Sequence, residues 1–375
     1  MVERILFEQA RKHLQDHRSI IILGPRRAGK TTLLRQIESI MAKPVLWLNG
    51  DDTDTRSLLS SPTSTSLEHL VGTSKSMVID EAQRIENIGI CIKLIVDNIP
   101  DVKVFATGSS SFELSNRISE PLTGRKWLYT LLPFSYEEAS LHFGRIEEKR
   151  LLERRLIYGY YPEVVNNPGS EREILKELSG SYLYKDILIW QNIKKPGQLE
   201  KLVQSLAFQI GNEISANELG QICGLDNETV ERYMDLLEKA FIIFRLKSLS
   251  RNLRNELKKS RKIYFYDNGI RNAVINNFNP AGLRNDIGAL WENFMISERM
   301  KSLMFHNLDA NIFFWRTNAQ QEIDYIEERD GFISATEFKW NTKKKFRITS
   351  TFTNAYPDSK TSVVTPENFE EFLKI

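Results

Sequence analysis

Gly24-Pro25-Arg26-Arg27-Ala28-Gly29-Lys30-Thr31 decides the fold of the first part of this chain, because it fits the phosphate-binding loop pattern G-x-x-x-x-G-K-[ST]. The apolar run 19–23 before it predicts a buried strand, and residues 32–37 after it predict a helix. Glycines permit the tight curl of such a loop, and its backbone N–H groups, together with the start of the helix, attract phosphates. The stretch therefore predicts a nucleoside triphosphate site.

The residue types in the loop predict how the nucleotide is held. Lys30 supplies a positive charge for the β- and γ-phosphates, and Thr31 supplies a hydroxyl ligand for Mg²⁺. The predicted nucleotide-binding residues are Gly24, Pro25, Arg26, Arg27, Ala28, Gly29, Lys30, Thr31, Thr32 and Ser109.

Two adjacent carboxylates end a later apolar run, Met77-Val78-Ile79-Asp80-Glu81. We expect Asp80 to hold the Mg²⁺ shell, and Glu81 to orient and deprotonate the attacking water. This pair favours hydrolysis over binding alone. The alternative is a plain acidic turn into the next helix.

Apolar runs alternate with helical patterns through this region, which predicts a parallel sheet covered on both faces. The predicted strands are residues 20–23, 45–48, 76–79 and 102–107. After the last strand, one of Thr107, Ser109 or Ser110 is expected to sense the γ-phosphate, although a serine-rich turn explains the same residues. Residues 51–66 are rich in Asp, Ser and Thr and predict a mobile loop.

Composition limits the class of protein. A chain of 375 residues with 41% hydrophobic and 27% charged residues predicts two or three soluble globular domains. No apolar run reaches the length of a membrane span and the start lacks a signal-peptide core, so we expect a cytoplasmic protein. Cys91 and Cys223 are far apart and without neighbouring ligands, so the sequence indicates neither a disulfide framework nor a zinc site and predicts two buried thiols.

The middle of the chain has the pattern of a winged helix. Helices are predicted at 198–210, at 216–222 with Ser215 as cap, and at 228–240 with Asn227 as cap. A tight turn at 224–226 and a strand at 241–246 complete a helix-turn-helix with a wing. The wing region, residues 245–262, has eight cations against the single acid Glu256. Its cations are Arg245, Lys247, Arg251, Arg254, Lys258, Lys259, Arg261 and Lys262.

The start of the predicted recognition helix, 228–240, argues against DNA binding. Its exposed residues are Glu228, Thr229, Glu231 and Arg232, and two of the four are acidic. A DNA reader and a protein adaptor therefore both stay open.

Near the C-terminus, Asp324 lies on an alternating segment, 322–326, and Glu337 and Lys339 lie on the next strand, 334–340. Alternation places Glu337 and Lys339 on one face, where Asp324 can join them. Two carboxylates hold Mg²⁺ or Mn²⁺ and a lysine activates water in phosphodiester cleavage; Glu292, on a preceding helix, is a candidate further ligand. The alternative is a pair of ordinary solvent-facing charges.

Taken together, the quoted segments resemble a family of bacterial and archaeal AAA-type ATPases fused to a C-terminal domain of unknown function. The resemblance rests on GPRRAGKTTLL, VIDEAQ, TGSSS, LTGR, LLPFSYEEA, YGYYPEV, SRNLRNELKKSRKIYFYDNGIRNA, GALWENF, FFWRT, EIDYI and EFKW. Arg27-Ala28 and Tyr160 depart from it, where glutamine-valine and glycine are expected. The order of Glu292, Asp324, Glu337 and Lys339 resembles the PD-(D/E)XK nuclease superfamily.

Arg125, after the glycine of LTGR, is the candidate arginine finger, with Arg117 in reserve. In such ATPases the finger comes from an adjacent subunit, so the resemblance implies a homo-oligomer. The basic run of Lys343, Lys344, Lys345 and Arg347 fits either nucleic-acid contact or a solvated turn.

The predicted protein is of the α/β class. Residues 1–145 form a P-loop AAA-type parallel sheet with helices, 146–262 a helical and winged helix-turn-helix part, and 263–375 a restriction-endonuclease-like part. The predicted function is Mg²⁺-dependent ATP hydrolysis coupled to DNA binding and, where the second site is active, to DNA cleavage. One alternative is a nucleotide-dependent switch that binds a protein partner and keeps an inactive nuclease-like part. A small-molecule kinase is a third, less favoured by the middle and C-terminal patterns.

Overall fold

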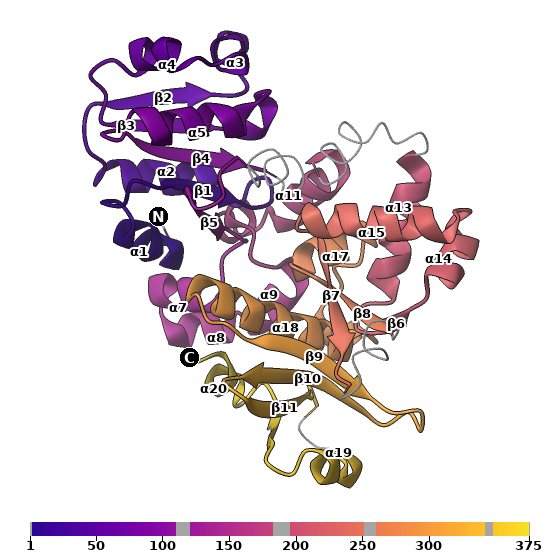
Figure 1. Ribbon diagram of the computed structural model, residues 1–375. Helices are drawn as coiled ribbons and strands as arrows, with labels where there is room; N and C mark the ends of the chain where they lie inside the picture. The colour runs from indigo at the N-terminus through magenta and orange to yellow at the C-terminus, as the bar shows by residue number, and fades with distance from the viewer. Residues whose placement is uncertain (1, 110–120, 183–195, 251–259, 342–347, 375) are drawn as a thin grey trace. The chain divides into compact units, whose positions relative to one another are not determined.

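The computed structural model describes residues 2–109, 121–182, 196–250, 260–341 and 348–374 (Figure 1). The chain forms two units, one of Met1–Phe134 with Lys239–Phe241, and one of Ser135–Glu238 with Ile242–Ile375. Each unit is built on a sheet of its own. No helix of the described residues is long and apolar enough to cross a membrane.

The sheet of the first unit has the strand order β2-β3-β4-β1-β5, and every pair of neighbours is parallel. Its strands are β1 (Ser19–Leu23), β2 (Val45–Asn49), β3 (Ser76–Asp80), β4 (Lys103–Gly108) and β5 (Lys126–Thr130). The predicted parallel sheet is confirmed, and β5 is an additional strand. Because all strands run in one direction, their carboxyl ends meet at the same edge, which carries the loop after β1, Asp80 at the end of β3 and Glu81 after it.

The helices of this unit cover the sheet (Figure 1). They are α1 (Ile5–Lys12), α2 (Lys30–Glu38), α3 (Thr53–Ser60), α4 (Ser64–Val71), the 3₁₀ turn η1 (Ala82–Arg84) and α5 (Ile88–Asn98). Leu6 of α1 and Leu33 and Ile37 of α2 share a buried cluster with Ile20 and Ile22 of β1. The alternation along β1 sends these two isoleucines to the same face, so the core holds the strand and the helix on either side of the phosphate loop.

The prediction of a mobile loop at 51–66 was wrong, since this region contains α3 and the start of α4. The polar residues that suggested a loop are helix caps. The Asp52 side chain accepts hydrogen bonds from the N–H groups of Asp54 and Thr55, and Thr63 and Ser66 form a reciprocal capping box. Such residues favour turns and helix starts for the same reason, because they satisfy free backbone donors.

The sheet of the second unit has seven strands in the order β12-β11-β10-β9-β7-β8-β6. Its strands are β6 (Glu213–Ile214), β7 (Ile243–Ser248), β8 (Arg261–Phe265), β9 (Asn311–Arg316), β10 (Glu322–Arg329), β11 (Phe332–Phe338) and β12 (Lys360–Val364). The parallel pairing of β7 with β9 joins the predicted wing to the C-terminal strands. The predicted boundary after residue 262 thus falls inside β8, in a continuous sheet.

The remaining helices of the second unit pack around and beside this sheet (Figure 1). They are α7 (Tyr136–Phe143), α8 (Arg145–Arg150), α9 (Leu152–Tyr158), α10 (Pro162–Asn166), α11 (Glu171–Glu177), the π-helical turn η2 (Leu178–Tyr182), α13 (Pro196–Phe208), α14 (Ala216–Cys223), α15 (Asn227–Lys239), α17 (Asn268–Val274), the 3₁₀ turn η3 (Ala281–Leu283), α18 (Ile287–Phe305), α19 (Ser350–Ala355) and α20 (Phe369–Leu373).

Three predicted helices of the middle part are confirmed as α13, α14 and α15, with Ser215 as the cap of α14. The predicted cap of α15 was wrong by one residue. Asp226, and not Asn227, accepts the hydrogen bond from the N–H of Thr229, at 2.8 Å, and a second one from its hydroxyl. Cys91 and Cys223 are both buried, as predicted.

Gly159 in the YGYYPEV segment lies against a buried carboxylate. Asp267 accepts hydrogen bonds from the N–H groups of Tyr160, at 2.7 Å, and Ile270, at 3.1 Å, which fixes the start of α17 to the chain after α9. A Cβ added at Gly159 would lie 2.1 Å from Asp267 Oδ1, and the φ of Gly159 is +70°. The glycine therefore allows a close approach that no other residue permits.

We predict that Gly159→Ala lowers the free energy of unfolding by roughly 2–4 kcal/mol, from steric overlap together with the positive φ. Gly169→Ala is the matched control, since Gly169 has a φ of +101° with no atom within 4 Å of the added Cβ. In Gly169→Ala, the free energy of unfolding should fall only by the cost of the positive φ, on the order of 1 kcal/mol. Urea unfolding measures both, and equal losses would contradict the role of Asp267.

Candidate functional site

The phosphate loop occupies the turn between β1 and α2, as its pattern predicts. Two residues of the loop take left-handed backbone angles, Arg27 with a φ of +59° and Gly29 with a φ of +94°. A Cβ at Gly24 would lie 2.0 Å from the carbonyl oxygen of Leu131, so only glycine fits there. The predicted residues Pro25, Arg26 and Ala28 lie within this curl, and Thr32 lies in the first turn of α2.

Lys30 opens α2 and is 5% exposed. Its Nζ donates hydrogen bonds to the carbonyl oxygens of Gly24 and Pro25, both at 2.9 Å. The ammonium group is thus held inside the curl of the loop, where it can meet the phosphates of a nucleotide.

Thr31, Asp80 and Thr107 bring three oxygen-bearing side chains together at the carboxyl edge of the sheet. Thr31 Oγ1 donates to Asp80 Oδ2 at 2.7 Å, and the buried Thr107 hydroxyl donates to Asp80 Oδ1. A hydroxyl next to a carboxylate fits the oxygen ligands that Mg²⁺ prefers. Thr31 and Asp80 are therefore the residues that would hold Mg²⁺, with Thr107 orienting the carboxylate.

Glu81 follows Asp80 in a left-handed conformation, with a φ of +51°. This uncommon backbone state turns its N–H toward Asp80 Oδ1 and Thr107 Oγ1, both at 3.2 Å. The Gln83 side chain donates to Glu81 Oε2 at 2.6 Å and to Ser109 Oγ at 3.0 Å. Gln83, to which sequence reasoning assigned no role, thus positions the candidate base and connects it to the candidate phosphate sensor.

The candidate sensors differ in their surroundings. Thr107 is engaged with Asp80, whereas Ser109 contacts Gln83, so Ser109 is the better placed of the described hydroxyls to report on a nucleotide. Ser110 lies outside the described residues, as does the reserve arginine finger Arg117.

Arg125 lies just before β5, whose first residue pairs in parallel with Ser19 at the start of β1. It is therefore at the amino-terminal edge of the sheet, opposite the edge that carries its own phosphate loop. Its Nε contacts Asp97 Oδ1 at 2.6 Å. From this position Arg125 can act as a finger only on the nucleotide of another copy of the chain.

Arg4 is a residue of this site that sequence reasoning missed. It is 4% exposed and donates from Nη1 to the carbonyl of Ala28, at 2.9 Å, and from Nη2 to the carbonyl of Leu132, at 2.6 Å. Because C=O and N–H point in opposite directions across a trans peptide, the Ala28 contact turns the N–H of Gly29 away from Arg4. Arg4 thereby fixes the orientation of one phosphate-binding donor from behind the loop.

We predict that Arg4→Met weakens nucleotide affinity about tenfold or more, because the Gly29 donor loses its fixed orientation and Ala28 loses a charged donor. Arg4→Lys should recover part of the loss. Fluorescent nucleotide titration measures the affinity, and thermal unfolding of the same samples separates it from stability. Unchanged affinity in a folded Arg4→Met protein would contradict this role.

A second group of polar residues lies at β10 and β11 of the second unit. Lys339 Nζ is 2.6 Å from Glu337 Oε2 and 3.4 Å from Asp324 Oδ2, and the Phe338 N–H donates to Asp324 at 2.9 Å. The structure thus brings together the three residues that the strand pattern predicted to share a face.

Asp324 lies in a β-bulge of β10. The register of β10 on β9 shifts between Ile323 and Ile326, and both isoleucines join the same buried cluster. Without the shift, a spacing of three residues would send them to opposite faces.

Glu292 of α18 is not held by Lys339 but by a different lysine. Lys262 Nζ of β8 lies 3.2 Å from Glu292 Oε1 and 2.5 Å from Glu322 Oε1, and the Tyr264 hydroxyl donates to Glu292 at 2.6 Å. Although burial lowers the pKa of Lys262, the carboxylates of Glu292, Asp324 and Glu322 raise it, and the net pKa lies above its ordinary value. Burial and the charge of Asp324 raise the pKa of both Glu292 and Glu337.

The predicted metal set of Glu292, Asp324 and Glu337 finds no support in this arrangement. Among the residues that the structure describes, no group of three or more His, Cys, Asp or Glu side chains is placed to hold a metal ion. The physical reason is that two lysines divide the carboxylates between them. These residues do not fit a divalent ion as they lie.

Of the described cations of the wing, Arg245, Arg261 and Lys262 form ion pairs within the unit, whereas Lys247 is exposed. Arg245 pairs with Glu231, at 3.0 Å, and with Asp235 and Glu238, and Arg261 pairs with Glu231 at 3.1 Å. These contacts neutralise the acidic side of α15. The other predicted wing cations Arg251, Arg254, Lys258 and Lys259 lie outside the described residues, as do Lys343, Lys344, Lys345 and Arg347.

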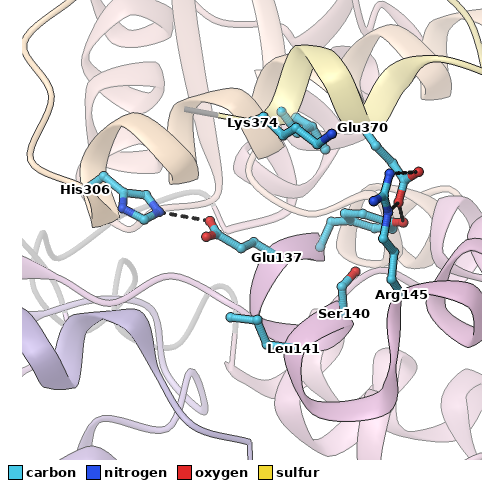
Figure 2. Close-up of a pocket in the computed structure, with 9 residues that line it drawn as sticks. Glu137, Ser140, Leu141, Arg145, His306, Glu370 and Lys374 are labelled. Carbon is cyan, nitrogen blue, oxygen red and sulfur yellow. Dashed lines mark hydrogen bonds and ion pairs between the residues drawn. The ribbon is translucent and has the colours of Figure 1, made fainter.

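A cavity of about 560 Å³ in the second unit is lined by α7, α8, α20 and the residue after α18, His306 (Figure 2). Two pairs of charged side chains line it, Arg145 Nε with Glu370 at 2.6 Å and His306 Nε2 with Glu137 at 3.0 Å (Figure 2). The Arg145 guanidinium beside Glu370 lowers the pKa of that carboxyl to about 2. None of the predicted site residues lines this cavity, so it does not belong to either candidate site.

Comparison with known families divides the chain into consecutive parts. Residues 16–140 match the family described as an AAA domain. Residues 149–281 and 287–373 match two domains of unknown function, DUF8612 and DUF4143. Together with the parallel sheet, the first match supports an AAA-type ATPase.

Relatives of the chain extend across bacteria and archaea. An uncharacterized protein of Mycobacterium tuberculosis is 26% identical over 330 residues, covering 86% of this chain and 71% of its own. An uncharacterized protein of Methanocaldococcus jannaschii is 24% identical over 327 residues, covering 82% and 71%. The structure of a Walker-type ATPase of Pyrococcus abyssi aligns with a TM-score of 0.51 at 14% identity, over 73% of this chain and 96% of that one. This likeness shows a P-loop ATPase fold.

Proposed function

We propose that the first unit binds ATP with Mg²⁺ and hydrolyses it. The observation that carries the proposal is the convergence of Lys30, Thr31 and Asp80 at one edge of the parallel sheet, with Thr31 Oγ1 2.7 Å from Asp80 Oδ2. The match to an AAA domain supports the same function. Glu81, next to Asp80, adds the group that distinguishes hydrolysis from binding.

Each residue has a proposed role. Lys30 and the N–H groups of the loop bind the phosphates, and Mg²⁺, when held by Thr31 and Asp80, neutralises their charge. Glu81 accepts the proton of the attacking water while Gln83 holds its carboxylate. Arg125 of one copy reaches the nucleotide of a neighbour in a homo-oligomer, consistent with its place at the opposite edge of the sheet.

We further propose that hydrolysis is coupled to a macromolecule bound by the second unit. DNA is supported by the helix-turn-helix order of α14 and α15 before the β7–β8 hairpin. A protein partner is the second candidate, and the pairing of Arg245 with three carboxylates of α15 favours it, since these contacts use charge that DNA binding would need. In either case the proposed function includes no cleavage of DNA, because the carboxylates at β10 and β11 pair with lysines and do not fit a metal ion.

Steady-state ATP hydrolysis by the full chain at low salt, with and without double-stranded DNA, tests both proposals. ATP hydrolysis that DNA stimulates, and that loses this stimulation as salt rises, supports DNA as the partner. ATP hydrolysis at the same rate with and without DNA supports a nucleotide-dependent switch that binds a protein partner. Absence of ATP hydrolysis under all conditions would reject the proposed function.

A further inference from the structure

Lys262 is a buried charge that sequence reasoning assigned only to the basic wing. It is 1% exposed, although lysine side chains are almost never fully buried unless paired. Its Nζ contacts Glu292 of α18 and Glu322 of β10, and the Tyr264 hydroxyl donates to the same Glu292 oxygen. Because its ammonium has these partners, Lys262 belongs to a buried ion pair and is not a solvent-exposed cation of the wing.

The position of Lys262 follows from the sheet. β8 pairs with β7, and β7 pairs in parallel with β9, which is the neighbour of β10. Lys262 of the predicted wing therefore lies near the carboxylates that β10 and β11 carry. Lys339 approaches this group from the other side and contacts Glu337 and Asp324. The two ammonium groups together carry the charge of one divalent cation.

We propose that the Lys262 ammonium takes the place of a divalent metal ion at Glu292. The three carboxylates of Glu292, Asp324 and Glu337 therefore do not bind a metal ion in the folded chain. The pairing of Lys262 with Glu292 explains why the order of residues resembles a nuclease although the described residues contain no group placed to bind a metal ion. Lys262 acts by pairing with Glu292, while Lys339 pairs with Asp324 and Glu337. This inference is independent of ATP hydrolysis in the first unit.

Removal of the charge should open the site. Lys262→Met keeps the length of the side chain but leaves Glu292 free to join Asp324 and Glu337 as a ligand set of hard oxygens. We expect the variant to bind one Mn²⁺ about tenfold or more tightly than the parent chain. Adding Glu292→Gln to Lys262→Met should remove the gain, and Lys360→Met, at an exposed lysine of β12, should give none.

The measurement is Mn²⁺ titration followed by electron paramagnetic resonance of the free ion, without nucleotide. All chains carry Asp80→Asn, so that the first unit contributes no metal ligand set. A Lys262→Met chain that is folded by circular dichroism yet binds Mn²⁺ no more tightly than its parent would overturn the proposal.

A second comparison keeps the test decisive where Lys262→Met fails to fold. In the chain that retains Lys262, Glu292→Gln should change Mn²⁺ affinity by less than about twofold, because Glu292 already serves the lysine. A parent chain that binds Mn²⁺ tightly, and loses this binding on Glu292→Gln, would show that Glu292 is a metal ligand and would overturn the inference.

Discussion

Lys30→Ala should abolish ATP hydrolysis. The ammonium group lies in the curl of the phosphate loop, where it is 5% exposed and hydrogen-bonded to two loop carbonyls, so its charge acts at low effective dielectric. Loss of one such preorganised donor costs about 10²–10³-fold in turnover, and the loss of its contact to the ground-state phosphates weakens binding as well. Release of inorganic phosphate under saturating Mg²⁺ and ATP measures the effect.

Lys12→Ala is the matched control, since Lys12 is an exposed residue in the last turn of α1. It should leave turnover unchanged. Undiminished hydrolysis by a pure Lys30→Ala protein would show that the phosphate loop is not the site of the reaction.

Glu81→Gln should separate binding from hydrolysis. The amide has the size of the carboxylate but cannot accept a proton from water, so we expect turnover to fall by roughly 10²–10⁴-fold. Nucleotide affinity should stay within about threefold, because Lys30, Thr31 and Asp80 are untouched. The backbone N–H of residue 81, which donates to Asp80, is also kept, and the side chain contacts Gln83. Turnover and fluorescent nucleotide binding, measured on the same samples, give the two values.

The control for this substitution is Glu86→Gln, at an exposed glutamate shortly after η1. It should affect neither value. If Glu81→Gln retained full turnover, the proton would leave the attacking water by another route and the assignment of Glu81 would fail.

The sequence allowed the phosphate site to be predicted because its parts are local. The loop, its glycines and Lys30 are contiguous, and Asp80 and Glu81 end a buried run whose position at the carboxyl edge follows from parallel pairing. Residue roles in this part depend on short stretches of chain, which sequence patterns describe well.

Long-range contacts could not be predicted in the same way. Arg4 reaches Ala28 and Leu132, which are 24 and 128 residues away, and nothing in its own neighbourhood indicates either partner. Lys262 looked like one cation of a basic wing, and the packing of β8 against α18 brings it to Glu292. Contacts between distant parts of the chain therefore decided the roles of Arg4 and Lys262.

Local polarity misled the prediction in smaller ways. The Asp, Ser and Thr residues of 51–66 cap α3 and α4, although such residues also favour loops. The alternation of charged and apolar residues correctly predicted that Glu337, Lys339 and Asp324 lie together. It could not indicate that Glu292, the further predicted metal ligand, pairs with Lys262.

The central claim is that the edge of the first sheet that carries Lys30, Asp80 and Glu81 hydrolyses ATP. The most direct test is to measure ATP binding and phosphate release together, on the wild-type chain, Lys30→Ala and Glu81→Gln. The account predicts that the wild type binds and turns over ATP, that Glu81→Gln binds without turnover, and that Lys30→Ala does neither. Equal phosphate release by all three proteins would contradict it.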